Sequence, residues 1–124
     1  MHTQTTAESP TNHRGNGQVS YLLLEPGQFG SRHLGITWVD ADPGSQQSLH
    51  SHPDSEQVYV IVSGRGEMII EGERREVDAG TMVFIPPASK HAIHNPGPER
   101  LTYVSAAAPP FEMPIGEFAY EPNS

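Results

Sequence analysis

Short apolar runs, separated by Gly, Pro, Asn and Asp, dominate the pattern of this chain. The runs are rich in β-branched residues, and no window keeps the 3.6-residue period of an amphipathic helix. This pattern predicts β-strands. We expect strands over residues 19–24, 34–39, 48–52, 57–62, 66–71, 74–77, 81–85, 91–94 and 101–106. Many short strands at this spacing indicate an all-β sandwich or barrel.

The two ends of the chain differ from this middle part. Residues 1–17 are mostly small and polar with little to bury, so we expect a flexible N-terminal tail. Residues 18–108 contain all the predicted strands and form the predicted barrel. Residues 109–124 are too apolar for a free tail, and we expect this C-terminal extension to pack on the barrel or on a partner subunit. Its large apolar residues are Phe111, Met113, Ile115, Phe118 and Tyr120.

Candidate chemistry gathers in the stretch from residue 44 to residue 64. His50 and His52 are two positions apart, so on a strand both imidazoles point to the same face. The next run places Gln57 on one face and Glu56 on the other. The stretch therefore brings two imidazoles together with either an amide or a carboxylate.

A third histidine follows farther along the chain. The apolar run over residues 81–85 is stopped by Pro86 and Pro87, and His91 comes just after this turn. Three neutral imidazoles and one oxygen donor suit a divalent transition metal such as Zn, Ni, Fe, Mn or Cu. His94 has the spacing of a surface or rim residue, and we do not expect it to bind the metal.

The two stretches resemble the two motifs of the cupins, a family of small double-stranded β-helix, or jelly-roll, barrels. The first reads Gly-x5-His-x-His-x4-Gln-x6-Gly, and the second reads Gly-x5-Pro-x-Ala-x2-His-x3-Asn. The resemblance extends over residues 19–108. It implies a cupin barrel with one divalent transition-metal ion. The metal ligands are expected to be His50, His52, Gln57 and His91.

The fourth ligand and the catalytic group are less well defined by the pattern. Counting back from Gly64 selects Gln57, whereas the shorter spacing from His52 selects Glu56, and a site without either is also open. We favour Gln57, because it keeps the spacing to Gly64 and shares a face with Tyr59. Tyr59 is the candidate catalytic residue, as a hydrogen-bond donor or proton carrier. The alternative for Tyr59 is a core aromatic with a satisfied hydroxyl.

Composition narrows the class of partner and the location. The chain has 124 residues, which suits one domain, and no cysteine, which excludes disulfides and thiolate ligands. Its formal net charge of −8 disfavours binding to nucleic acid or to anionic membranes. No apolar run approaches the ~20 residues of a membrane helix, and residues 1–18 lack the apolar core of a signal peptide. We therefore expect a cytoplasmic protein.

The charge of the predicted ligand set indicates the kind of small molecule. Three neutral imidazoles and a neutral amide leave the charge of a divalent ion uncompensated, which favours an anionic hydroxy, keto or carboxylate ligand. The cupin resemblance spans dioxygenases, isomerases, decarboxylases, lyases and polyketide-cyclase-like proteins. We expect a metalloenzyme that acts on a small organic acid or polar metabolite. The alternative is a metal-dependent binding module without turnover. Because such barrels leave edge strands exposed, we also expect a homodimer.

Overall fold

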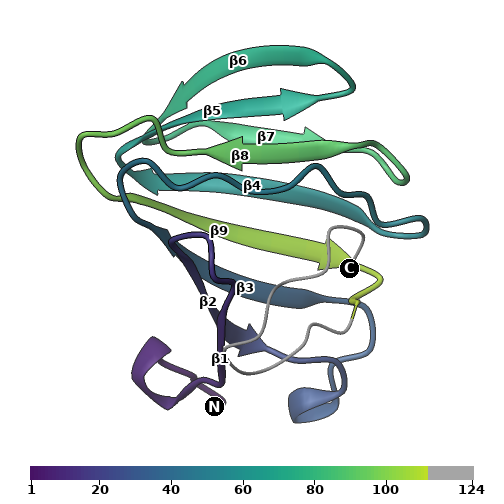
Figure 1. Cartoon of the computed structure of the whole chain (residues 1–124). Helices are drawn as coiled ribbons and strands as arrows, with labels where there is room; N and C mark the ends of the chain where they lie inside the picture. The colour runs from purple at the N-terminus through teal and green to yellow at the C-terminus, as the bar shows by residue number, and fades with distance from the viewer. Residues whose placement is uncertain (112–124) are drawn as a thin grey trace.

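Two antiparallel β-sheets enclose the core of this protein (Figure 1). The computed structural model describes residues 1–111. The six-stranded sheet has the order β1-β2-β3-β9-β4-β7, and the three-stranded sheet has the order β6-β5-β8. The elements are η1 Thr6–Glu8, β1 Thr11–His13, β2 Gln18–Leu24, η2 Gln28–Gly30, β3 Gly35–Ala41, β4 Glu56–Ser63, β5 Arg65–Ile70, β6 Glu73–Asp78, β7 Met82–Ile85, β8 His91–His94 and β9 Leu101–Ala108. The predicted all-β class is confirmed.

Eight of the predicted strands form, with ends within two residues of the expected ones. The strand predicted over residues 48–52 is wrong, because this segment makes only an isolated bridge between His50 and His91. Its neighbour in space is β8, but the Gln47 side chain accepts the hydrogen bond from the Ile93 backbone N–H, at 3.0 Å. A side chain thus replaces the backbone acceptor that a continuous ladder would use.

The expectation of a flexible N-terminal tail is corrected for residues 11–14. Strand β1 pairs antiparallel with β2 at the edge of the large sheet (Figure 1). Asn12 is fully buried and Arg14 is 7% exposed. The strand was missed because it buries polar side chains, whereas the hydrophobic pattern detects only apolar ones.

The core forms between the inward faces of the two sheets. Val39, Tyr59 and Ile61 come from the large sheet, and Met68 and Ile93 come from the small one. Strand β4 alternates as its sequence predicted, with one face buried and the other turned outward. This alternation fixes which side chains of β4 reach the interior.

The outward face of β4 and β7 is apolar. Val60 pairs with Met82 across the two strands, and Val62 and Phe84 are also exposed. None of the helices formed by residues 1–111 has the length and apolar character needed to cross a bilayer. Of the extension predicted over residues 109–124, the part beyond Phe111 lies outside the described residues.

Candidate metal centre

Three histidines meet inside the sheets at one end of β8. The nearest ring nitrogens of His50, His52 and His91 all lie within 4.8 Å of one another, and all three residues are buried. His50 and His91 face each other through reciprocal backbone hydrogen bonds of 3.0 and 2.9 Å. The Ala88 N–H also donates to the His52 carbonyl, at 2.8 Å. Backbone pairing therefore sets the positions of the three side chains.

Hydrogen bonds to the backbone fix the tautomer of two of these imidazoles. The Nδ1–H of His50 donates to the Ser48 carbonyl at 2.8 Å, and that of His91 donates to the Ser89 carbonyl at 2.9 Å. In a neutral imidazole, donation from Nδ1 puts the ring's lone pair on Nε2, which is the atom that would bind a metal. The Nε2 atoms of His52 and His91 are buried and have no hydrogen-bond partner among residues 1–111. Buried imidazole nitrogens of this kind are suited to coordinate a metal ion.

Burial keeps the three imidazoles neutral. It lowers the pKa of His50 to about 3, with a further contribution from the neighbouring His91. Burial and His91 also lower the pKa of His52 to about 4, and burial lowers the pKa of His91 itself. Near neutral pH all three side chains are therefore uncharged, which is the state that binds a metal ion.

Gln57 supplies an oxygen to the same cavity. Its side chain points inward from β4, and its Nε2 donates to the Ser105 hydroxyl at 2.7 Å. This bond orients the amide, and its Oε1 is buried without a hydrogen-bond partner in the described part of the chain. Glu56 is exposed on the opposite face of β4. Of the two residues that spacing allowed, Gln57 is the one in the cavity, and its binding to a metal stays a prediction.

The donor set fits a divalent transition metal. A buried acceptor without a partner costs about 1–3 kcal/mol, and as far as residues 1–111 show, the site has such atoms on His52, His91 and Gln57. A cation bound among them satisfies all three at once. Imidazole nitrogens with one amide oxygen suit Zn, Ni, Fe, Mn or Cu rather than Mg or Ca.

Tyr59 and His94 occupy different surroundings. Tyr59 lines the cavity with the histidines, and its ring centroid lies 6.0 Å from that of His91. It also packs against Tyr103 in the core, so its catalytic role stays a prediction. His94 is not one of the clustered histidines, and its Nδ1 accepts a hydrogen bond from the Gln47 backbone N–H at 3.2 Å.

Arg14 is a residue of this site that the sequence did not indicate. It follows β1 and lines the cavity together with His50, His52 and Gln57. Its positive charge contributes to the lowered pKa of both His50 and His52. No Asp or Glu lines this cavity in the described part of the chain. The alternation that turns Asn12 and Arg14 inward could have indicated this residue. Both side chains are polar, so a search for hydrophobic periodicity does not detect them.

Comparison with known proteins decides the family. A cupin domain model matches residues 37–107, which is more than half of the chain. The chain belongs to the cupin family. The matched segment contains all four predicted metal ligands, whereas Arg14 and Phe111 lie outside it.

Relatives and solved structures agree with this assignment. The uncharacterized protein MJ1618 of Methanocaldococcus jannaschii is 32% identical over 96 residues, which cover 77% of each chain. The polyketide synthase CurC of Streptomyces cyaneus is 34% identical over 102 residues, which cover 82% of this chain and 66% of that protein. The crystal structure of a predicted oxalate decarboxylase from Thermotoga maritima superposes with a TM-score of 0.78 at 21% identity, covering 88% of this chain and all of that one. This last likeness shows the jelly-roll fold.

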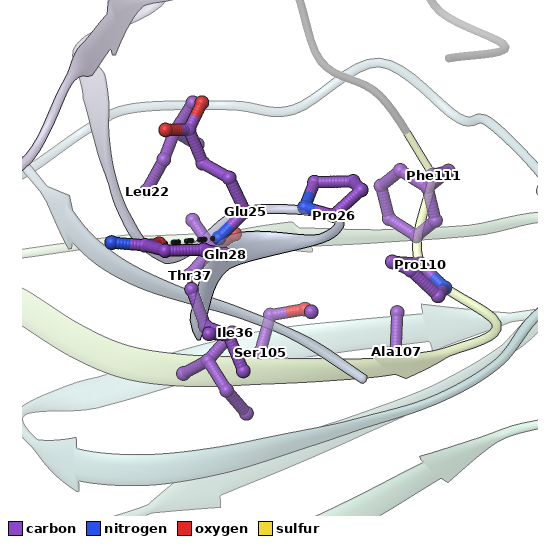
Figure 2. Close-up of a pocket in the computed structure, with 12 residues that line it drawn as sticks. Leu22, Glu25, Pro26, Gln28, Ile36, Thr37, Ser105, Ala107, Pro110 and Phe111 are labelled. Atoms are coloured by element: carbon purple, nitrogen blue, oxygen red, sulfur yellow. Dashed lines mark hydrogen bonds between the residues drawn. The ribbon is translucent and has the colours of Figure 1, made fainter. Parts of the chain in front are cut away.

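Phe111 separates the inner cavity of the cupin fold from a larger outer pocket. Its ring stacks on His52, with centroids 3.7 Å apart and planes 9° from parallel. The inner cavity measures about 10 Å³, which suits an ion or a single water. The outer pocket measures about 480 Å³, and Phe111, Thr37 and Ser105 line both spaces (Figure 2). Displacing the Phe111 ring would therefore join them.

Proposed function

We propose that this cupin binds one divalent transition-metal ion and acts on a small anionic molecule held at that ion. The proposed ligands are His50, His52, His91 and Gln57. The observation that carries the proposal is the cluster of three buried imidazoles whose nitrogens lie within 4.8 Å of one another. Within the described residues, two of those nitrogens and the Gln57 oxygen have no hydrogen-bond partner.

Hydrogen bonds within the chain orient the proposed metal ligands. The Ser48 and Ser89 carbonyls hold two imidazoles in the metal-binding tautomer, and Ser105 orients the Gln57 amide. When bound, the ion would supply Lewis-acid chemistry, or oxygen activation if it is redox-active. Tyr59 is the residue we propose as proton carrier, since its side chain lines the same cavity. The reaction would be of the oxygenase, isomerase, lyase or cyclase type.

A metal-dependent binding module without turnover is the second candidate. The size of the inner cavity favours it, because about 10 Å³ leaves no room for an organic substrate while Phe111 stays on His52. The two candidates differ in one measurable property. An enzyme consumes oxygen or converts a hydroxy, keto or carboxylic acid when loaded with metal, whereas a binding module only retains the acid.

Metal analysis of the full chain without an affinity tag tests the proposal. We expect about one transition-metal ion per chain by plasma mass spectrometry. His50→Ala and His91→Ala should lower the metal affinity by more than the roughly 10–100-fold that loss of a ligand's hydrogen-bond partner costs. His94→Ala is the matched control and should keep its metal.

Two results would contradict the proposal. One is a chain that contains no metal and takes up none on reloading. The other is equal loss of metal from all three variants, because His94 would then contribute as much as the proposed ligands.

A further inference from the structure

The outward face of the six-stranded sheet carries apolar side chains across most of its width. Residues that pair directly across antiparallel strands have their side chains on the same face. The register therefore places one row of side chains across five neighbouring strands: Met82, Val60, Val104, Trp38 and Tyr21. The row beside it contains Phe84, Val58, Ala106 and Ile36. Neither row contains a charged residue.

The described elements leave both rows in contact with solvent. No residue of the two rows is fully buried, whereas the residues that alternate with them on β4 and β9 are buried. Met82 is 58% exposed, Phe84 49% and Val60 41%. An antiparallel sheet that packs on one side only usually turns a polar face to water. A sheet that is apolar on both faces therefore indicates a second contact surface.

The polar groups beside the two rows already have partners. The Nε1–H of Trp38 donates to a carboxylate oxygen of Asp40 at 3.3 Å, and the Thr102 hydroxyl donates to the same oxygen at 2.8 Å. The guanidinium of Arg100 lies 3.9 Å from the other oxygen of Asp40. An apolar surface placed over the rows would therefore leave the indole N–H paired, and burying it would cost little.

We propose that the outward face of the six-stranded sheet packs against the same face of a second copy of this chain, in a two-fold symmetric homodimer. Five strands about 4.8 Å apart, with three outward residues on each, measure roughly 24 by 20 Å. With the relief of the side chains included, the accessible area of such a face is on the scale of the roughly 800 Å² that each partner buries in a standard interface. A second copy supplies a face of the same size, twist and apolar character, as sheet-on-sheet packing about a two-fold axis requires.

Charge favours a second copy over other partners. The formal net charge of −8 repels anionic lipids and nucleic acid. Two copies of so acidic a chain also repel each other, and they approach most easily through a surface without charge. The two rows are such a surface. None of their residues is a proposed metal ligand, so the inference does not depend on the proposed function.

Sedimentation equilibrium and the fluorescence of Trp38 test this interface in the full chain. We expect the wild type at micromolar concentration to have about twice the mass of the 13.5 kDa chain. Trp38 is the single tryptophan of the sequence and lies within the proposed interface. Its emission should therefore shift to longer wavelength, and its quenching by acrylamide should increase, as dilution separates the two copies.

Variants with a new charge locate the interface. Val60→Glu should weaken the dimer by a factor of roughly 100 or more, because the interface would bury one carboxylate from each copy. Met82→Glu changes a more exposed position of the same row and should weaken the dimer also if Val60→Glu fails to fold. Leu49→Glu is the matched control, because it adds the same charge to an exposed apolar side chain outside the sheet and should leave the dimer intact.

Three results would overturn the inference. A dimer that persists in Val60→Glu and Met82→Glu would be formed by another surface. A wild-type monomer whose Trp38 emission stays at short wavelength on dilution would indicate that residues 112–124 cover the face instead. A wild-type monomer whose Trp38 is open to acrylamide at every concentration would show that the face is left to solvent.

Discussion

Position 57 controls the charge that the predicted metal site presents to its ligand. The Gln57 amide is neutral, and its hydrogen bond to Ser105 turns the oxygen toward the free side of the cavity. A glutamate there would offer the same oxygen with a negative charge. The geometry for the metal would be kept, while the attraction for an anion would fall.

Gln57→Glu should therefore retain the metal and bind carboxylates less tightly. We expect oxalate affinity to fall roughly tenfold or more, since like charges a few ångströms apart in a protein repel by more than 1 kcal/mol. Calorimetric titration of the metal-loaded variant measures this. Glu56→Gln changes the exposed neighbour on the outer face and should leave oxalate binding as it is. An unchanged affinity in Gln57→Glu would refute the charge argument.

Local spacing along the sequence predicted most residues of this site, but it could not predict Arg14. His50, His52 and His91 follow from two motifs, and period-two alternation separates Gln57 from Glu56. Ala88, at a position where cupins usually have Gly, has a φ of 65° in the turn that binds His52. A turn of this kind explains the usual glycine. Arg14 reaches the cavity only through the pairing of β1 with β2, a long-range contact that no local pattern encodes.

At the scale of elements, the segment after β9 closes the site. Pro109 to Phe111 continue the chain past the end of β9, and the Phe111 ring stacks on His52. Figure 2 shows Pro110 and Phe111 at the outer pocket. The ring lines both the small inner cavity and the outer pocket, so we expect ions and ligands that enter from the outer pocket to displace it. The end of β9 thus places Phe111 where we expect it to limit access to the histidines.

Phe111→Ala should open this route. Ring stacking is worth about 0.5–1.5 kcal/mol, so we expect bound cobalt to be released to a chelator roughly 2–10 times faster. Stopped-flow absorbance in the presence of a chelator measures the rate. Phe84→Ala removes an exposed ring from the outer face of β7 and serves as control. A release rate equal to that of the wild type would show that Phe111 does not limit access.

The elements themselves were predictable where they bury apolar side chains. Strands β2 to β9 follow the sequence pattern closely. The segment at residues 48–52 was expected to be a strand because its histidines alternate. Instead, the Ile93 backbone N–H donates to the Gln47 side chain, and the Gln47 backbone N–H donates to the His94 side chain, and these bonds replace part of the ladder. Strand β1 escaped prediction because Asn12 is a buried polar residue.

At the scale of the whole molecule, the predicted metal ligands come from both sheets. Gln57 belongs to the six-stranded sheet, and His91 begins a strand of the three-stranded one. A shared metal ion would therefore link the sheets across the core and stabilise the native state but not the unfolded chain. The expected homodimer stays a prediction, supported by the exposed apolar face of β4 and β7.

Metal binding should accordingly raise the unfolding temperature. Zinc at one hundred times its dissociation constant adds about 2.7 kcal/mol to the free energy of unfolding, or roughly 10 °C for a domain of this size. Calorimetry with zinc, and again after addition of a chelator, measures the shift. His91→Ala should show no shift. If zinc does not change the unfolding temperature of the wild-type chain, the result would argue against a metal shared between the sheets.

The position of β1 has a further consequence for how such a protein could be changed. The predicted ligands all come from the segment that the cupin model matches, whereas a short hairpin before it supplies Arg14 to the cavity wall. Residues 1–17 could therefore be exchanged for those of a relative without touching the histidines. Such an exchange would change the part of the cavity wall that Arg14 forms and leave the predicted metal ligands in place.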